Sequence, residues 1–185
     1  MRCLFFLLSG WASTAAAQNS LAPPDTVAVR VQVRGVDCAL FPAAARWPRW
    51  HQPVQLRRFT PSLTQAQAAE QSLPKVALLT LSRNPASPQE HGYATRIKRR
   101  LGQYHRQYFG FYNAQQQPCL YLSSVAAIAW NEAELRTPPA PGYVPHWQRE
   151  ALELADAGDN YWGIYYNLAT HQFYGYWHDL DVGGG

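Results

Sequence analysis

The chain has 185 residues, of which 47% are hydrophobic and 15% are charged, and its formal net charge is +4. Disordered proteins have few apolar and many charged residues, so this composition excludes a disordered chain and predicts a folded protein with a real core. The length leaves room for one domain but hardly for two.

The first seventeen residues have the layout of a secretory signal peptide. Arg2 supplies a positive charge, residues 3–11 are apolar, and small side chains stand at Ala15, Ala16 and Ala17. The apolar run is too short to span a bilayer as a helix. We therefore expect cleavage near Ala17 and a secreted or periplasmic protein, with no transmembrane segment in the mature chain. The expected organisation is a signal peptide at 1–17, a flexible lead-in at 18–25 and a single domain at 26–182.

The first half of that domain is predicted to contain one strand and two helices. Residues 26–34 alternate valine with other residues, which is typical of a half-buried strand. Ser62 suits a helix N-cap before an Ala- and Gln-rich run to residue 73, and Pro74 should end or kink that helix. Residues 83–92, with two prolines, are interpreted as a loop, and residues 94–103 as a short amphipathic helix.

The second half is predicted to be mainly strands. Residues 107–112 and 119–124 have strand character on either side of a turn. Near the end, residues 161–166 and 172–177 are typical of an aromatic hairpin. The expected fold is therefore α+β, with an antiparallel sheet whose C-terminal aromatic hairpin packs against one or two helices. A β-sandwich with peripheral helices is the alternative.

Two cysteines, Cys38 and Cys119, remain once Cys3 leaves with the leader. Exported proteins meet an oxidising compartment, where two thiols often pair, so the sequence predicts a Cys38–Cys119 disulfide. The alternative is two separately buried thiols that behave as small apolar residues.

Two short aromatic motifs resemble a known group of proteins. One is Leu-Gly-Gln-Tyr-His-Arg-Gln-Tyr-Phe-Gly-Phe-Tyr at residues 101–112, followed by a returning strand. The other is Asp-Ala-Gly-Asp-Asn-Tyr-Trp at residues 156–162, where the related pattern often has Gly-Gly in place of Ala157-Gly158. Together they resemble uncharacterised secreted proteins of Bacteroidota-type bacteria over residues 59–181. This resemblance implies a similar order of strands and brings no activity or site residues.

A basic cluster is the first candidate binding feature. Its members, interleaved with Tyr104 and Tyr108, are Arg96, Lys98, Arg99, Arg100 and Arg106. Residues 18–110 carry thirteen Arg and Lys against four acids, whereas residues 111–185 carry two Arg against eight acids. The cluster is either a surface for an anionic partner or a helix face that pairs with the acidic half of the chain. For Arg106 and Gln107 a further alternative is that they anchor the strand structurally.

The aromatic hairpin is the second candidate. Alternation places Trp162, Ile164 and Tyr166 in the core and leaves Tyr161 and Tyr165 as candidates for an exposed, sugar-stacking surface. Simple core packing of the whole hairpin is the alternative.

Catalytic and metal motifs are absent from the sequence. The six histidines lack metal-ligand spacing, and the polar residues 178–181 and 156–160 are better interpreted as solvated sequence and a turn. No nucleophile elbow is present. We therefore predict no catalytic residue, no cofactor and no metal, and a non-catalytic binding or interaction module at the cell envelope. Its partner would be an envelope macromolecule or another exported protein. The alternative is an exported hydrolase with a site assembled from distant residues.

Overall fold

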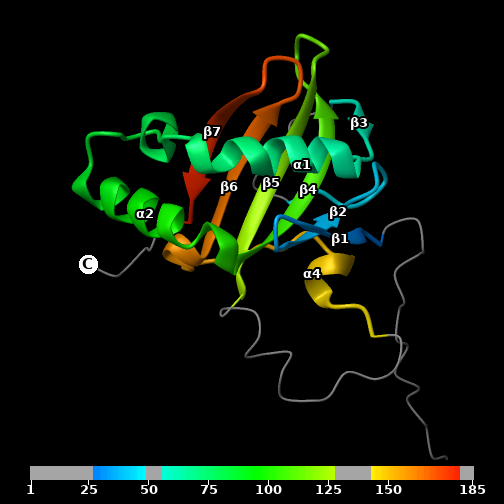
Figure 1. Ribbon diagram of the computed structural model, residues 1–185, viewed down its shortest axis with the longest axis horizontal. Helices are drawn as coiled ribbons and strands as arrows, with labels where there is room; N and C mark the ends of the chain where they lie inside the picture. Colours follow the sequence, from blue (N-terminus) through cyan, green and yellow to red (C-terminus); the bar gives the residue numbers. More distant parts are fainter. Residues whose placement is uncertain (1–26, 49–55, 128–142, 180–185) are drawn as a thin grey trace, which may run out of the picture.

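A mixed sheet lies at the centre of the computed structural model, which describes residues 27–48, 56–127 and 143–179 (Figure 1). The segments predicted to be a signal peptide and a lead-in, residues 1–17 and 18–25, lie outside the described residues. In the described chain the sheet has seven strands, in the order β1-β2-β4-β5-β6-β7, with β3 also paired to β4. The strands are β1 (Val29–Val33), β2 (Val36–Leu40), β3 (Arg58–Phe59), β4 (Tyr104–Tyr112), β5 (Pro118–Ala126), β6 (Tyr161–Asn167) and β7 (Gln172–His178).

One strand pair departs from the predicted antiparallel sheet. β2 runs parallel to β4, with Cys38 opposite Arg106 and Leu40 opposite Tyr108, while the other pairs are antiparallel. The short strand β3 continues the same edge of β4 and faces Gly110. A Cβ atom at Gly110 would stand 2.5 Å from the carbonyl oxygen of Phe59, so only glycine permits this approach. The α+β class is confirmed, and the sheet is mostly antiparallel.

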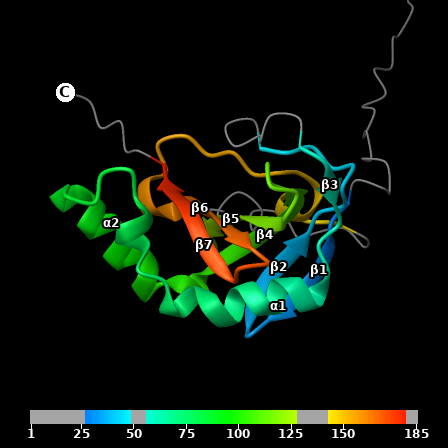
Figure 2. The same cartoon turned by 90° about the horizontal axis from the view of Figure 1, so that it is seen from above.

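Helices cover one face of the sheet (Figure 2). Helix α1 (Leu63–Ser72) begins at Ser62 in a capping box: Ser62 Oγ accepts from the Gln65 amide, and the Gln65 side chain accepts from the Ser62 amide. Pro74 ends α1 in a short 3₁₀ turn, as predicted. A second 3₁₀ turn, η4 (Leu78–Leu81), then leads towards helix α2.

Helix α2 (Pro88–Arg99) begins earlier than the sequence predicts. The sequence predicts a loop at Pro88. However, proline is well suited to the first turn of a helix, where the N–H that it lacks would have no partner within the helix. Ser87 is the N-cap, and its side chain accepts from the Glu90 amide. The buried residues of α2, Tyr93, Ala94 and Ile97, face the sheet, so the predicted helix at 94–103 is the second part of a longer one.

Segments without sheet pairing cover the other face. They comprise residues 41–48 and 143–157, which include the short helix α4 (His146–Arg149). Gln107 holds the second segment to β4, because its side chain donates to the carbonyl oxygens of Trp147 and Glu150 and accepts from the Leu152 amide. The alternative that Gln107 anchors structure is thus confirmed. Both faces of β4, β5 and β6 are buried as a result.

The predicted disulfide is wrong, because the two cysteines lie on opposite faces of the sheet. Cys38 belongs to the apolar cluster on the helix side, and Cys119 belongs to the cluster on the other side. Both are buried and free. Burial raises the pKa of Cys38 to about 12 and also raises that of Cys119, so neither thiol is readily ionised.

Thiol counting tests this arrangement. In a chain with Cys3→Ser, we expect two free thiols after unfolding without a reducing agent. In the folded protein at pH 8, labelling of both should be slow, since burial excludes the reagent and suppresses the thiolate. Finding no free thiol in the unfolded chain would restore the disulfide.

The C-terminal hairpin is confirmed with the predicted turn. β6 pairs with β7 from Asn167 opposite Gln172 to Trp162 opposite His178, and β7 places two residues opposite Ile164 at a bulge. Gly175, with φ of +60°, supplies the left-handed conformation that such a bulge requires. Gly163 lies directly beneath the ring of Trp177, where an added Cβ atom would be 2.6 Å from Nε1.

A glycine pair tests the packing of the hairpin. Gly163→Ala should lower the free energy of unfolding by about 1–3 kcal/mol, because the methyl group overlaps the Trp177 ring. Gly102→Ala is the control, since nothing lies within 4 Å of its Cβ position, and it should change stability by less than about 0.5 kcal/mol. Denaturant unfolding measures both, and equal effects would contradict the close packing.

Candidate functional site

The basic cluster predicted from the sequence is divided between three environments. Arg96 and Arg100 both reach Asp159, in the 3₁₀ turn η6 (Gly158–Asn160), with nitrogen-to-oxygen distances of 2.8 and 2.5 Å. These two arginines therefore pair with the acidic half of the chain, as the alternative interpretation held. They fix the C-terminal part of α2 against η6 rather than offering free charge.

Arg106 is not a surface residue, contrary to the prediction of a basic binding face. Its side chain is 0% exposed, and its Nε lies 3.1 Å from Glu70 Oε1. One terminal nitrogen donates to the carbonyl oxygen of Leu101 at 2.6 Å, and the guanidinium stacks over Trp162. The strand β4 alternates sides, and both sides are covered, so a charged residue on the helix-facing side has to find its partner inside the protein.

Glu70 receives a second hydrogen bond within this buried group. Tyr108 donates its hydroxyl to Glu70 Oε1 at 2.6 Å. Burial and the neighbouring carboxylate raise the pKa of Tyr108 well above its usual range, so the phenol stays protonated and remains a donor. One carboxylate of α1 is thus held by two side chains of β4, and this buried group serves the fold.

Removal of the guanidinium tests the buried ion pair. Arg106→Met should lower the free energy of unfolding by about 3–5 kcal/mol, because Glu70 is left as a buried charge without its counter-ion. Arg99→Met is the matched control on the exposed side of α2 and should change stability by less than about 0.5 kcal/mol. Chemical denaturation with constant slope m measures both, and a loss below 1 kcal/mol for Arg106→Met would contradict the assigned role.

The predicted aromatic binding surface is also not formed. Tyr161 is 2% exposed, and its hydroxyl donates to the carbonyl oxygen of Leu152 at 2.7 Å. Tyr165 is half-buried, with its ring 5.1 Å from that of Tyr121 and 5.2 Å from that of Tyr174. Trp162, Ile164 and Tyr166 are core residues, as predicted. The prediction of exposure failed because residues 143–157 cover the second face of the sheet.

His178, interpreted from the sequence as part of a solvated end, is buried in a polar joint between β7 and α2. Its Nε2 lies 2.9 Å from Glu90 Oε1, and Ser82 donates to the other carboxylate oxygen of Glu90 at 2.6 Å. The carboxylate thus stands between the hydroxyl and the imidazole. A nucleophilic serine needs the imidazole at its own Oγ, so this order does not form a Ser-His-acid triad.

No helix within the described ranges is long and apolar enough to cross a membrane. Among those same residues, no three His, Cys, Asp or Glu side chains gather where they would hold a metal ion. Asp156 and Asp159 lie at the turn before β6, the place that the sequence predicts for them.

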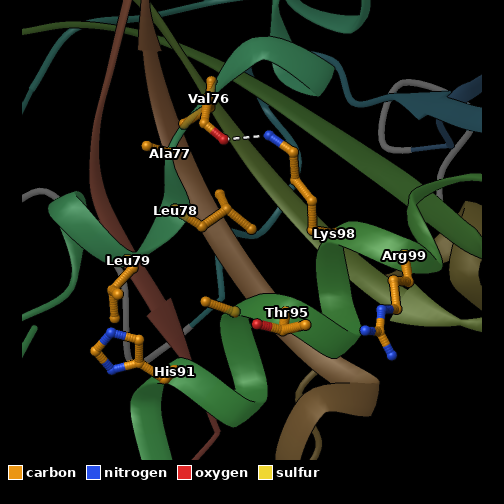
Figure 3. A pocket seen from close by; sticks show the side chains of 9 residues that line it. Val76, Ala77, Leu78, Leu79, His91, Thr95, Lys98 and Arg99 are labelled. Carbon is orange, nitrogen blue, oxygen red and sulfur yellow. Dashed lines mark hydrogen bonds between the residues drawn. The ribbon is translucent and has the colours of Figure 1, made fainter. Parts of the chain in front are cut away.

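A pocket of about 400 Å³ lies between α2 and the chain at residues 76–79 (Figure 3). We call it the α2 pocket. Its lining residues are Val76, Ala77, Leu78, Leu79, His91, Ala94, Thr95, Lys98 and Arg99. Leu78 and Ala94 are buried and make an apolar floor, whereas Thr95 and Arg99 are exposed. The pocket therefore combines an apolar base with a polar, cationic rim.

The charge of the α2 pocket has one sign. Lys98 Nζ donates to the carbonyl oxygen of Val76, and burial lowers the pKa of Lys98. Arg99 is exposed and forms no ion pair with any residue of the described chain. His91 Nδ1 lies 3.1 Å from the carbonyl oxygen of Ser87. Among the described residues that line the pocket there is no Asp or Glu to neutralise Lys98 and Arg99.

A second hollow of about 390 Å³ adjoins the first and shares Val76 and Ala77 with it. Its other lining residues are Ser72, Lys75, Thr80, Leu81, His171, Gln172 and Phe173. The described part of its lining likewise has basic residues and no Asp or Glu.

Of the residues proposed from the sequence, Lys98 and Arg99 line the α2 pocket. His91 and Thr95 also line it, although neither was a predicted site residue. Their spacing with Lys98 and Arg99 is that of one helix face. Thr95 lies in the predicted helix at 94–103, whereas His91 falls in the predicted loop at 83–92, which separates it from that face.

Comparison with known proteins adds no relative. No protein-family model matches the chain, and neither the search of curated proteins nor that of solved structures gives a significant match. The resemblance to secreted proteins of Bacteroidota-type bacteria stays a prediction based on short motifs.

Proposed function

We propose that this chain is an exported, non-catalytic binding protein that recognises an anionic macromolecule of the cell envelope through the outer surface of α2. The observation that carries the proposal is the α2 pocket, where Lys98 and Arg99 lie beside an apolar floor and none of the described lining residues carries a carboxylate. Unneutralised cations around a hollow attract anions and raise their local concentration.

The firm seating of α2 supports this role. Its first half is joined to β7 through Glu90 and His178, and its second half is joined to η6 through Arg96, Arg100 and Asp159. These contacts use the inward and lateral sides of the helix and leave Thr95 and Arg99 pointing outward. A ligand would therefore meet a helix that is already fixed in position, which lowers the entropic cost of binding.

Export is the part of the proposal that rests on sequence alone. The leader-like pattern of residues 1–17 supports it. The hydrolase alternative has weaker support, because the Ser82, Glu90 and His178 side chains that meet in space have the carboxylate at the serine and the imidazole beyond it. The binding function is therefore the one that the geometry favours.

Charge reversal on α2 tests the proposal. Arg99→Glu in the purified protein should reduce co-sedimentation with isolated cell envelopes at least fivefold at low salt, since it reverses the unpaired charge of the pocket. Arg100 is left unaltered because it pairs with Asp159 and its loss would disturb the seating of α2.

Arg46→Glu is the matched control for this experiment. Arg46 is exposed on the segment that covers the opposite face of the sheet, and its reversal makes the same change in net charge. It should leave co-sedimentation within about 1.5-fold of the unaltered protein. Equal losses for the two variants would show a general charge effect, and no loss for Arg99→Glu would overturn the proposed function.

A further inference from the structure

The shape and chemistry of the α2 pocket narrow the class of ligand that fits it. Among the described lining residues there is no Trp, Tyr or Phe, and His91 carries the one aromatic ring. Nucleobases and sugar rings are bound mainly by stacking on large aromatic faces and by many directed hydrogen bonds, so this lining favours another class of ligand. The aliphatic side chains of Val76, Leu78 and Leu79 suit a flexible hydrocarbon group.

The cations and the apolar residues are not mixed evenly around the hollow. Figure 3 shows Lys98 and Arg99 towards one end of the pocket and Leu79 with His91 at the other, with Leu78 between them. Thr95 lies on α2 between His91 and the two cations. A ligand that matches this layout has a negative head at one end and an apolar body along the rest.

Lys98, at the cationic end of the pocket, is partly buried and hydrogen-bonded to the protein. The ammonium group is partly withdrawn from water and bound to the carbonyl oxygen of Val76, which uses one of its three protons. Its other two protons remain for an acceptor. An anionic head placed beside Lys98 and Arg99 would restore the favourable charge balance that burial has weakened.

The pocket is open to solvent, and its volume has room for an apolar body of moderate length. A hollow of about 400 Å³ holds roughly a dozen non-hydrogen atoms at about 30 Å³ each. That is the size of a medium-length acyl chain with its head group. The adjoining hollow continues past Val76 and Ala77 to the apolar residues Leu81 and Phe173, so a longer chain has somewhere to extend.

We propose that the α2 pocket binds a single-chain anionic amphiphile, with the acidic head at Lys98 and Arg99 and the acyl chain along Leu78 and Leu79. The inference rests on the proposed function, since it names the ligand class of the same site. It assigns recognition to the acyl part of an envelope component rather than to a polysaccharide.

Dodecanoate, used below its micellar concentration, is the probe. Isothermal titration of the purified full chain should give saturable binding with one site. Butyrate, which has the same head, should bind at least 100-fold more weakly, because each lost methylene removes buried apolar contact. Dodecyltrimethylammonium, which has the same tail and a positive head, should bind at least tenfold more weakly.

A matched pair of variants places the binding in the α2 pocket. Thr95 is exposed, so both Thr95→Glu and Thr95→Gln should fold, which circular dichroism verifies. Thr95→Glu puts a carboxylate between the head-group site and the tail and should weaken dodecanoate binding at least tenfold. Thr95→Gln has nearly the same shape as Thr95→Glu without the charge, so dodecanoate should bind the Glu variant at least tenfold more weakly than the Gln variant.

The results separate the ligand class from the broader function. Absence of saturable dodecanoate binding, or equal binding by the two Thr95 variants, overturns the amphiphile site. If the Arg99→Glu variant still loses envelope association in that case, the proposed function stands without it. If Thr95→Glu weakens dodecanoate binding while Arg99→Glu leaves envelope co-sedimentation unchanged, the amphiphile site stands and the macromolecular partner is overturned.

Discussion

The buried ion pair between Glu70 and Arg106 is the constraint on which the rest of the structure depends. Two opposite charges in an apolar cluster tolerate little displacement, because separation leaves each of them without water and without a partner. Arg106 holds Glu70 of α1 and the carbonyl oxygen of Leu101 just after α2. A single guanidinium thus fixes both helical segments against the same strand.

The position of the candidate site follows from this arrangement. The chain between α1 and α2 has both of its ends fixed to the sheet, so residues 76–81 must cross beside α2. The crossing brings Val76 next to Lys98 and Leu78 next to Ala94, and the α2 pocket is the space left between them. The hollow is therefore a product of how two helices are attached, rather than of a loop that closes over a ligand. Such a rigid frame suits recognition by preset charges.

Sequence reasoning succeeded where the structure depends on near neighbours. The Ser62 cap and the aromatic hairpin are set by contacts within a few residues, and both formed as predicted. The alternation of residues 26–34 predicts a strand, which the structure has in the shorter form of β1, Val29–Val33, with Val29 62% exposed. The predicted loop at Pro88 was wrong because a proline is compatible both with a loop and with the first turn of a helix. Here Ser87 before it is an N-cap, so a helix begins. The β2–β4 pair has no local signature at all, since its strands are separated by both helices.

The burial of particular side chains could not be predicted from the sequence. Alternation tells which residues share a face, but it does not tell whether that face is covered. Alternation predicts an exposed Tyr161, and membership of the basic cluster predicts an accessible Arg106, but both are buried because the sheet has covering layers on each side. The disulfide failed for a related reason. Cys38 and Cys119 lie on strands that both neighbour β4, yet their side chains point into different layers. Only the three-dimensional arrangement decides such questions.

The parallel ladder between β2 and β4 has a consequence for the order in which the sheet assembles. The β1–β2 hairpin and the run from β4 to β7 each join strands that are consecutive in the chain, whereas three residue pairs, Cys38 to Leu40 with Arg106 to Tyr108, join the two parts. Closing the long loop between them costs conformational entropy, and only the contacts formed on docking offset that cost. We therefore expect the hairpin and the four-strand unit to form before they dock, with docking as a late step of folding. The ladder between β2 and β4 is also the place where the two parts can separate without breaking a strand pair within either of them.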